Sequence, residues 1–351
     1  MNKITVSAPG KLMLLGEHAV VYNHPCLVTA VDKRLYATVE MIDKPEFQLE
    51  AADVGITGYK KPMSEIGEGD VPKGAQFVEI AIKNTLRHSG LSRISRATAV
   101  GDSGVASPGA RRYLASLPRM TVGIRVVTKS EFIPKLGFGS SSASTVSTVK
   151  AVSELFGLNL SQKEIFDLSY KTVLDVQGKG SGFDVAAAVY GGTLYFATGG
   201  KVIEPLNISS LPLVVGYSGI KKDTVILMDR VKKSFSNRKN RLEEIYNGIE
   251  ALVNKGKESL IKMAWKRFGD LMNKNQEYLC ELGVSMYKLD RMVKASIDAG
   301  TYGAKLSGAG GGDFMIALHS VQGKLSVQKA IKKAGGEIID VGTNAEGVRE
   351  E

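Results

Sequence analysis

Two charged residues of this chain lie in small, apolar surroundings where an unpaired charge would be costly. Lys11 stands between Gly10 and an apolar run, and Asp184 ends the segment Gly180-Ser-Gly-Phe-Asp184 before a stretch of Val and Ala. A buried charge has to be solvated, paired or functional. Together the two residues would suit phosphoryl transfer, with the carboxylate accepting or orienting a substrate hydroxyl and the ammonium stabilising charge on a γ-phosphate. A structural salt bridge explains them equally well.

A loop rich in glycine and serine, Gly137–Ser142, precedes a predicted helix over residues 143–156. Gly137 and Gly139 allow tight backbone turns, and the serine run reaches the start of the helix. The free N–H groups and the positive end of the helix dipole favour an anion there. The serine hydroxyls could bind phosphate oxygens or Mg²⁺. The alternative is a plain N-cap with a flexible loop.

A third segment, Lys305–Asp313, carries glycine at four of the five positions from 308 to 312, between two strand-like runs. Such density lets the backbone approach a ligand closely, whereas a hairpin alone needs only one or two glycines. The chain contains no Walker A motif and no dinucleotide-binding G-x-G-x-x-G between a strand and a helix. A nucleotide site built from these loops therefore has another design.

The composition is that of an ordinary globular chain. Its 351 residues are 43% hydrophobic and 23% charged, which excludes a disordered or fibrous protein and allows two domains. The two cysteines exclude a disulfide scaffold, and no Cys/His cluster has zinc spacing. We expect a cytoplasmic protein, because neither a signal peptide nor a bilayer-spanning apolar run is visible.

The formal net charge is +10, and the basic residues are spread along helix-like stretches such as residues 231–241. A solvated basic face is the simplest explanation, so we expect neither a nucleic-acid nor a membrane partner. The segment Gly101-Asp-Ser-Gly104 looks like the nucleophile loop of a serine protease, yet the chain has only four His and no all-β pattern. We therefore do not expect a serine hydrolase.

A mixed framework of strands and helices has to bring the loops together. Period-two patterns predict strands, and helical periodicity with a capping box at Ser161–Glu164 predicts helices. The pattern changes near residue 200, from mostly strands and loops to a mostly helical and charged stretch. This change predicts two domains, 1–200 and 201–351. A long irregular insertion, 91–119, and a frayed polar tail, Thr343–Glu351, are also expected. The expected strands are 3–7, 27–39, 120–128, 211–217, two runs within 304–318, and 337–341; the expected helices are 143–156, 161–176, most of 224–299, and 326–334; and 185–196 is expected to be a helical turn followed by a strand.

Four motifs in order resemble those of the GHMP kinase superfamily. The first, with Gly16-Glu-His-Ala-Val-Val-Tyr22, is similar to mevalonate kinases, since phosphomevalonate kinases usually have an aromatic residue at the position of His18. The stretch 177–191 and Asp313 look more like phosphomevalonate kinases. Galactokinases would have Thr-Asp-Tyr in place of Ala19-Val-Val21. The resemblance covers residues 4–318 apart from 91–119, and its motifs are Pro9-Gly-Lys11 with Gly16–Tyr22, Gly137-Phe-Gly-Ser-Ser-Ser-Ala143, Ser181-Gly-Phe-Asp184 and Gly308-Ala-Gly-Gly-Gly-Asp313.

The resemblance implies a role for each matching residue. Asp184 would be the catalytic aspartate beside the accepting hydroxyl, and Lys11 would polarise that hydroxyl and the γ-phosphate. Ser141 would bind Mg²⁺ and phosphate. The counterpart of a Mg²⁺-binding glutamate would be Asp175, a shorter carboxylate that requires a two-residue gap. The implied ATP-binding residues are Lys135, Gly137, Gly139, Ser140, Ser141, Ser142 and Ala143, with Ser140 and Ser142 as alternatives to Ser141 for Mg²⁺, and the implied substrate-binding residues are Glu17, His18, Gly308, Ala309, Gly310 and Gly311.

The implied fold is α+β, with an N-terminal domain like domain 2 of ribosomal protein S5 and a ferredoxin-like C-terminal domain. The implied activity is ATP- and Mg²⁺-dependent phosphorylation of the primary hydroxyl of mevalonate, in isoprenoid biosynthesis. Phosphomevalonate is the alternative acceptor, and its phosphate would need extra cations, for which Lys135, Lys179 and Arg34 are candidates. A non-catalytic nucleotide- or anion-binding protein is the alternative of another class, and a homodimer stays open.

Overall fold

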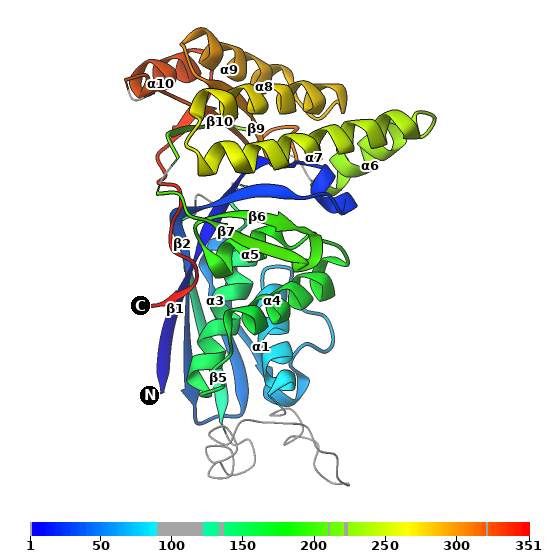
Figure 1. The fold of residues 1–351 in the computed structure, drawn as a ribbon. Helices are drawn as coiled ribbons and strands as arrows, with labels where there is room; N and C mark the ends of the chain where they lie inside the picture. The colour runs from blue at the N-terminus through cyan, green and yellow to red at the C-terminus, as the bar shows by residue number, and fades with distance from the viewer. Residues whose placement is uncertain (1, 90–121, 133–136, 210, 221–223, 321) are drawn as a thin grey trace.

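Strands β1 (Lys3–Leu15) and β2 (Cys26–Ile42) form a long antiparallel hairpin at the centre of the larger of two sheets. The computed structural model describes residues 2–89, 122–132, 137–209, 211–220, 224–320 and 322–351 (Figure 1). The pairing of the hairpin shifts register between Pro9 and Gly10, because proline has no N–H for the ladder. Strand β1 therefore continues well past the predicted residues 3–7 and includes Lys11.

The larger sheet has six further strands and carries helices on one face (Figure 1). Its elements are β3 (Glu46–Ala51), β4 (Ile56–Pro62), β5 (Gly123–Ser130), β6 (Thr193–Ala197), β7 (Val202–Leu206) and β12 (Arg349–Glu350), the helices α1 (Gln76–His88), α3 (Ser140–Leu155), α4 (Gln162–Gln177) and α5 (Phe183–Tyr190), and the 3₁₀ turns η1 (Ala19–Tyr22), η2 (Ala52–Val54), η3 (Met63–Glu65) and η5 (Thr198–Gly200). The strand order is β12-β1-β2-β5-β3-β4, and β6 pairs with both β2 and β7. The larger sheet thus extends past residue 200 and is rejoined by the C-terminal strand.

The predicted helices of this half are present. The capping box before α4 is formed, because the Ser161 side chain accepts a hydrogen bond from the Glu164 N–H and the Glu164 carboxylate accepts one from the Ser161 N–H. Helix α3 begins at Ser140, three residues before the predicted start. The serine run is therefore the first turn of the helix. The predicted insertion at 91–119 lies outside the described residues.

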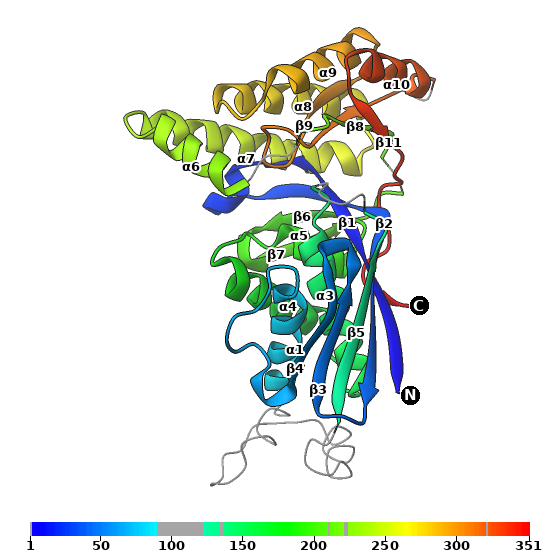
Figure 2. The same cartoon turned by 180° about the vertical axis from the view of Figure 1, so that it is seen from behind.

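The smaller sheet is antiparallel, and helices α8 (Trp265–Glu281), α9 (Tyr287–Asp298) and α10 (Lys324–Lys333) pack against it (Figure 2). Its elements are β8 (Leu213–Tyr217), β9 (Gly303–Ser307), β10 (Phe314–Leu318) and β11 (Glu337–Ile339), with α6 (Thr224–Ser234), α7 (Lys239–Ile261), α8 (Trp265–Glu281), α9 (Tyr287–Asp298) and α10 (Lys324–Lys333). The order β11-β8-β10-β9 corresponds to strands 4-1-3-2 of this unit, which is a ferredoxin-like arrangement. In the described chain, no helix is long and apolar enough to cross a membrane.

One hydrophobic core continues from the larger sheet into the smaller unit. It contains Leu12 and Leu14 of β1 together with Phe268 of α8 and Phe314 of β10. The ring of Phe314 lies 4.2 Å, centroid to centroid, from that of Phe138 in the glycine-serine loop. This contact holds the loop before α3 against the strand that follows the third glycine-rich segment.

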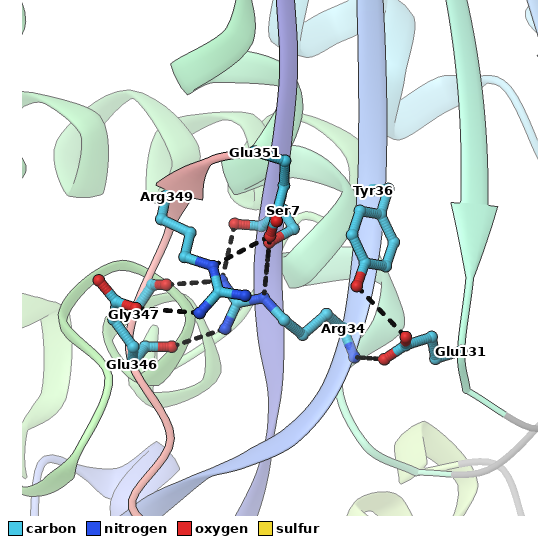
Figure 3. A network of polar contacts seen from close by, with 8 residues as sticks. All are labelled: Ser7, Arg34, Tyr36, Glu131, Glu346, Gly347, Arg349 and Glu351. Atoms are coloured by element: carbon cyan, nitrogen blue, oxygen red, sulfur yellow. Dashed lines mark hydrogen bonds and ion pairs between the residues drawn. The ribbon is translucent and has the colours of Figure 1, made fainter.

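The prediction of a frayed C-terminal tail is wrong. Strand β12 pairs with β1, and Arg34, only 5% exposed, holds the preceding residues (Figure 3). Its Nη1 donates to the Glu346 carbonyl at 2.8 Å, its Nη2 to the Gly347 carbonyl at 2.7 Å, and its Nε to Ser7 Oγ at 2.6 Å. Arg34 is therefore not the free cation for a substrate phosphate that the sequence suggested.

Replacing Arg34 by Met should lower the free energy of unfolding by about 3 kcal/mol, because buried carbonyls would lose a charged donor. Urea unfolding would measure the change. Arg349→Met is the matched control, since that arginine is exposed and its surface ion pairs contribute little. Equal unfolding midpoints for the two variants would contradict the assignment of Arg34 as the anchor of the tail.

Candidate active site

The first motif, Pro9-Gly-Lys11 with Gly16–Tyr22, meets the second, the glycine-serine loop Gly137–Ser142, at Lys11. Its backbone N–H donates to the Phe138 carbonyl at 2.9 Å, and its Nζ donates to the Gly137 carbonyl at 2.9 Å. The ammonium also lies 5.4 Å from the centre of the Phe183 ring, at the start of α5. The loop before α3 is thus attached to β1 through a lysine whose charge faces the beginning of α5.

Asp184, in the first turn of α5, lies beside the start of α3. Ser142 Oγ donates to Asp184 Oδ2 at 2.7 Å, and Oδ1 accepts the N–H of Val185 at 3.0 Å. Burial lowers the pKa of Lys11, and the carboxylate of Asp184 is the strongest of the charges that oppose this shift. Lys11 and Asp184 therefore lie on either side of Gly139, and Ser142 is the serine whose hydroxyl contacts the carboxylate.

The start of α3 has the features on which the prediction of an anion site depends. Helix α3 is 16 residues long, and its first turn contains an exposed Ser140, a half-buried Ser141 and a buried Ser142. The first N–H groups of a helix lack partners within the helix, and the helix dipole is positive there. A phosphate oxygen can therefore bind beside Lys11, in front of the helix.

Gly139 lies between the two charged residues. Its φ is +84°, and a Cβ built on it would stand 3.4 Å from Lys11 Cε and 3.6 Å from Asp184 Cβ. A side chain at this position would be strained by the backbone and would also contact both catalytic candidates. Only glycine leaves this space free.

Substituting Gly139 by Ala should lower turnover by roughly ten- to a hundredfold, because relief of the strain at its positive φ would shift the loop between Lys11 and Asp184, and a small displacement of reacting groups is costly. Gly157→Ala provides a matched control: its φ is +59°, and a Cβ there would meet nothing within 4 Å. Both variants should lose about 1–2 kcal/mol of stability from backbone strain, as thermal unfolding would show. A Gly139 variant as active as the Gly157 variant would contradict the proposed sensitivity of the site to the backbone at Gly139.

The third glycine-rich segment connects β9 to β10 and reaches both other segments. A Cβ on Gly137 would lie 2.9 Å from Asp313 Oδ2, so this carboxylate lies against the glycine-serine loop. The Ala309 carbonyl accepts a hydrogen bond from His18 Nε2 at 2.8 Å, which assigns the ring proton to Nε2. Burial lowers the pKa of His18, so the neutral ring leaves Nδ1 as an acceptor.

Glu17, predicted to line the substrate pocket, is paired with a lysine of the smaller sheet. Its side chain is fully buried and forms an ion pair with Lys305 of β9. The second carboxylate oxygen accepts a hydrogen bond from Asn275 Nδ2 at 3.1 Å. Lys305 and Asn275 were not identified from the sequence as site residues. The available signal was a lysine three positions before Gly308, at the start of the third glycine-rich segment, but nothing local indicated its partner.

Of the remaining predicted residues, Gly308, Gly310 and Gly311 lie in the loop between β9 and β10, where the Gly311 N–H donates to the Val284 carbonyl at 2.7 Å. Ala143 is buried in the first turn of α3. Lys135 lies outside the described residues. The three glycine-rich loops therefore come together around Lys11 and Asp184.

The serine hydroxyls fit a magnesium ion better than Asp175 does. Mg²⁺ in nucleotide sites usually takes one or two protein oxygens together with phosphate oxygens, and the first turn of α3 can supply hydroxyls. Asp175 lies near the end of α4, where it accepts hydrogen bonds from Asn84 at 2.9 Å and Lys171 at 2.5 Å. Among the described residues, no group of three His, Cys, Asp or Glu could hold a metal. The side chain of Asp175 therefore contacts α1 and its own helix rather than the glycine-rich loops.

Comparisons with known proteins identify the family of the chain. Residues 106–192 match the model of the GHMP kinases N terminal domain, and residues 257–336 match that of the GHMP kinases C terminal domain. The mevalonate kinase of Thermococcus sibiricus is 34% identical over 99% of this chain and 98% of its own length, and that of Pyrococcus horikoshii is 35% identical over 99% and 97%. The crystal structure of the Methanococcus jannaschii mevalonate kinase is 26% identical, with a TM-score of 0.74, and the match covers 96% of this chain and 97% of that one.

The fold and these relatives define a phosphotransferase with an alcohol acceptor. The chain belongs to the GHMP kinase family, in its mevalonate kinase branch. The predicted α+β fold with two GHMP kinase domains is thereby confirmed.

Proposed function

We propose that this protein transfers the γ-phosphate of ATP to the primary hydroxyl of mevalonate. The observation that carries the proposal is the arrangement of Lys11, Asp184 and the first turn of α3 around one point, linked by the Ser142–Asp184 and Lys11–Gly137 hydrogen bonds. That arrangement offers an anion site, a cation and a carboxylate together, which phosphoryl transfer to an alcohol requires. Relatives named mevalonate kinase support the choice of acceptor.

In the proposed reaction, Asp184 accepts the proton of the acceptor hydroxyl while the hydroxyl oxygen bonds to the γ-phosphorus. The bond from that phosphorus to the bridging oxygen breaks, and ADP leaves with the electron pair. Lys11 stabilises the charge on the transferring phosphoryl group, and Ser142 holds the carboxylate in orientation. Ser141 would hold Mg²⁺, which when bound with the nucleotide supplies charge neutralisation of the phosphates.

The alternative acceptor, phosphomevalonate, has less support from the described residues. Of the three cations suggested for its extra phosphate, Arg34 is occupied by the C-terminal tail and Lys135 lies outside the described residues. Lys179 lies exposed between α4 and α5. No built site for a second phosphate is therefore supported among these candidates.

An ADP-release assay with each acceptor tests the proposal. Turnover with ATP and mevalonate is expected, with little or none for phosphomevalonate. Turnover with phosphomevalonate alone would overturn the choice of acceptor, and nucleotide binding without turnover of either would favour the non-catalytic alternative. The use of Mg²⁺, the cytoplasmic location, a homodimer, and the absence of nucleic-acid and membrane partners stay predictions.

A further inference from the structure

The ion pair between Glu17 and Lys305 is fully buried on both sides. It joins the end of β1 to β9 of the smaller sheet, and the Lys305 ammonium also donates to the Leu306 carbonyl. Asn275 of α8 completes the partners of the carboxylate. Taking two charges out of water is expensive, and such a pair often contributes less to stability than apolar residues of the same size would. Stability alone is therefore a weak explanation for it.

The pair is one of three contacts made at alternate positions of one segment. Lys305 contacts Glu17, the Ser307 hydroxyl bonds both the N–H and the carbonyl of Met13, and the Ala309 carbonyl accepts from His18. Lys305 and Ser307 face the same side because they are alternate residues of β9, and the third contact comes from a backbone carbonyl of the loop that follows. The end of β9 and its loop therefore dock on the segment that carries His18.

His18 is held in an uncommon backbone conformation. Its φ is +62° with ψ −49°, which a residue other than glycine adopts only where its surroundings impose it. The preceding residue is Glu17, so its buried ion pair fixes the backbone directly before this strained turn. Burial lowers the pKa of Lys305 while the Glu17 carboxylate opposes that shift, as expected for a buried lysine that faces a carboxylate.

We propose that Lys305 is a positioning residue for the acceptor: acting through Glu17, it holds the His18 turn in the conformation that binds the acceptor alcohol. This inference rests on the proposed function, because it assigns His18 to the acceptor side of the site. It predicts that loss of the pair weakens acceptor binding and leaves nucleotide binding nearly unchanged.

The test uses the full chain with Lys305→Met, Glu17→Gln and the double variant Glu17→Gln/Lys305→Met. Lys305→Met alone leaves a buried unpaired carboxylate and should lower the melting temperature by roughly 10 °C. The double variant removes both charges and should recover most of that loss. It should still raise the KM for mevalonate about tenfold, while the KM for ATP changes less than about twofold.

Lys257→Met/Glu204→Gln is the matched control, because this partly exposed ion pair also joins α7 to β7 away from the site. It should leave both KM values unchanged. A double variant of Glu17 and Lys305 that folds and has wild-type KM values would overturn the proposal, as would an equal rise in both KM values. If that double variant does not fold, Glu17→Gln alone is used with the same criteria, since Lys305 can then become neutral.

A failure of the proposed function is distinguishable from these outcomes. It would be seen in the wild-type chain, as turnover of an acceptor other than mevalonate. The comparison of KM values would then be made with that acceptor, and the same split between acceptor and ATP would still be required.

Discussion

Replacing Asp184 by Asn should lower kcat by about 10²–10⁴-fold, the usual contribution of a positioned general base. Asparagine keeps the size of the side chain and can still accept a hydrogen bond from Ser142, but it cannot take the proton of the alcohol. Nucleotide binding should be retained, because the first turn of α3 is unchanged. Steady-state turnover and equilibrium titration with an ATP analogue would measure the two effects separately.

The matched control is Asp167→Asn. Asp167 is an exposed residue of α4 that pairs with Lys163 on the surface, so its loss should change neither turnover nor nucleotide binding. A turnover of the Asp184 variant within a few-fold of the wild type would remove this carboxylate from the mechanism. If the Asp184 variant lost both turnover and binding of the ATP analogue, the result would instead indicate a collapsed site.

Lys11→Met should lower kcat/KM by about 10²–10³-fold, because the cation stabilises charge that develops on the transferring phosphoryl group. The chain should still fold, since burial already disfavours the charged lysine and methionine has a similar length. Lys3→Met is the control: this lysine lies exposed on the same strand and should have no effect on turnover. Near-normal kcat/KM in the Lys11 variant would contradict its role.

The pH profile gives a second test of Lys11. Its pKa is lowered by burial, with Asp184, Asp313 and Glu17 opposing the shift. A lysine carries its charge below its pKa, so kcat/KM of the wild type should fall as the pH rises through this lowered value, earlier than for an ordinary lysine. Lys11→Arg keeps its charge throughout and should lose this alkaline decline. An identical decline in the arginine variant would assign it to another group.

Much of the framework could be predicted because its signals are local. The capping box at Ser161–Glu164 and the run of serines after Gly139 depend on neighbours within a single turn. Motif order likewise predicted that Lys11 and Asp184 belong to one site. Predictions failed where the partner is distant: the tail was expected to fray because its polar residues have no local partner, whereas Arg34 holds it from 312 residues away.

The sequence by itself identified the candidates for the chemistry, since small residues around a lysine, an aspartate and three serines are visible without a fold. Only the tertiary structure decided that Ser142, rather than its neighbours, contacts Asp184, and that Glu17 is paired with Lys305, 288 positions along the chain. The reason is physical. Composition and periodicity depend on the neighbours of a residue in the sequence, whereas the partner of a buried charge depends on how the two sheets pack against each other.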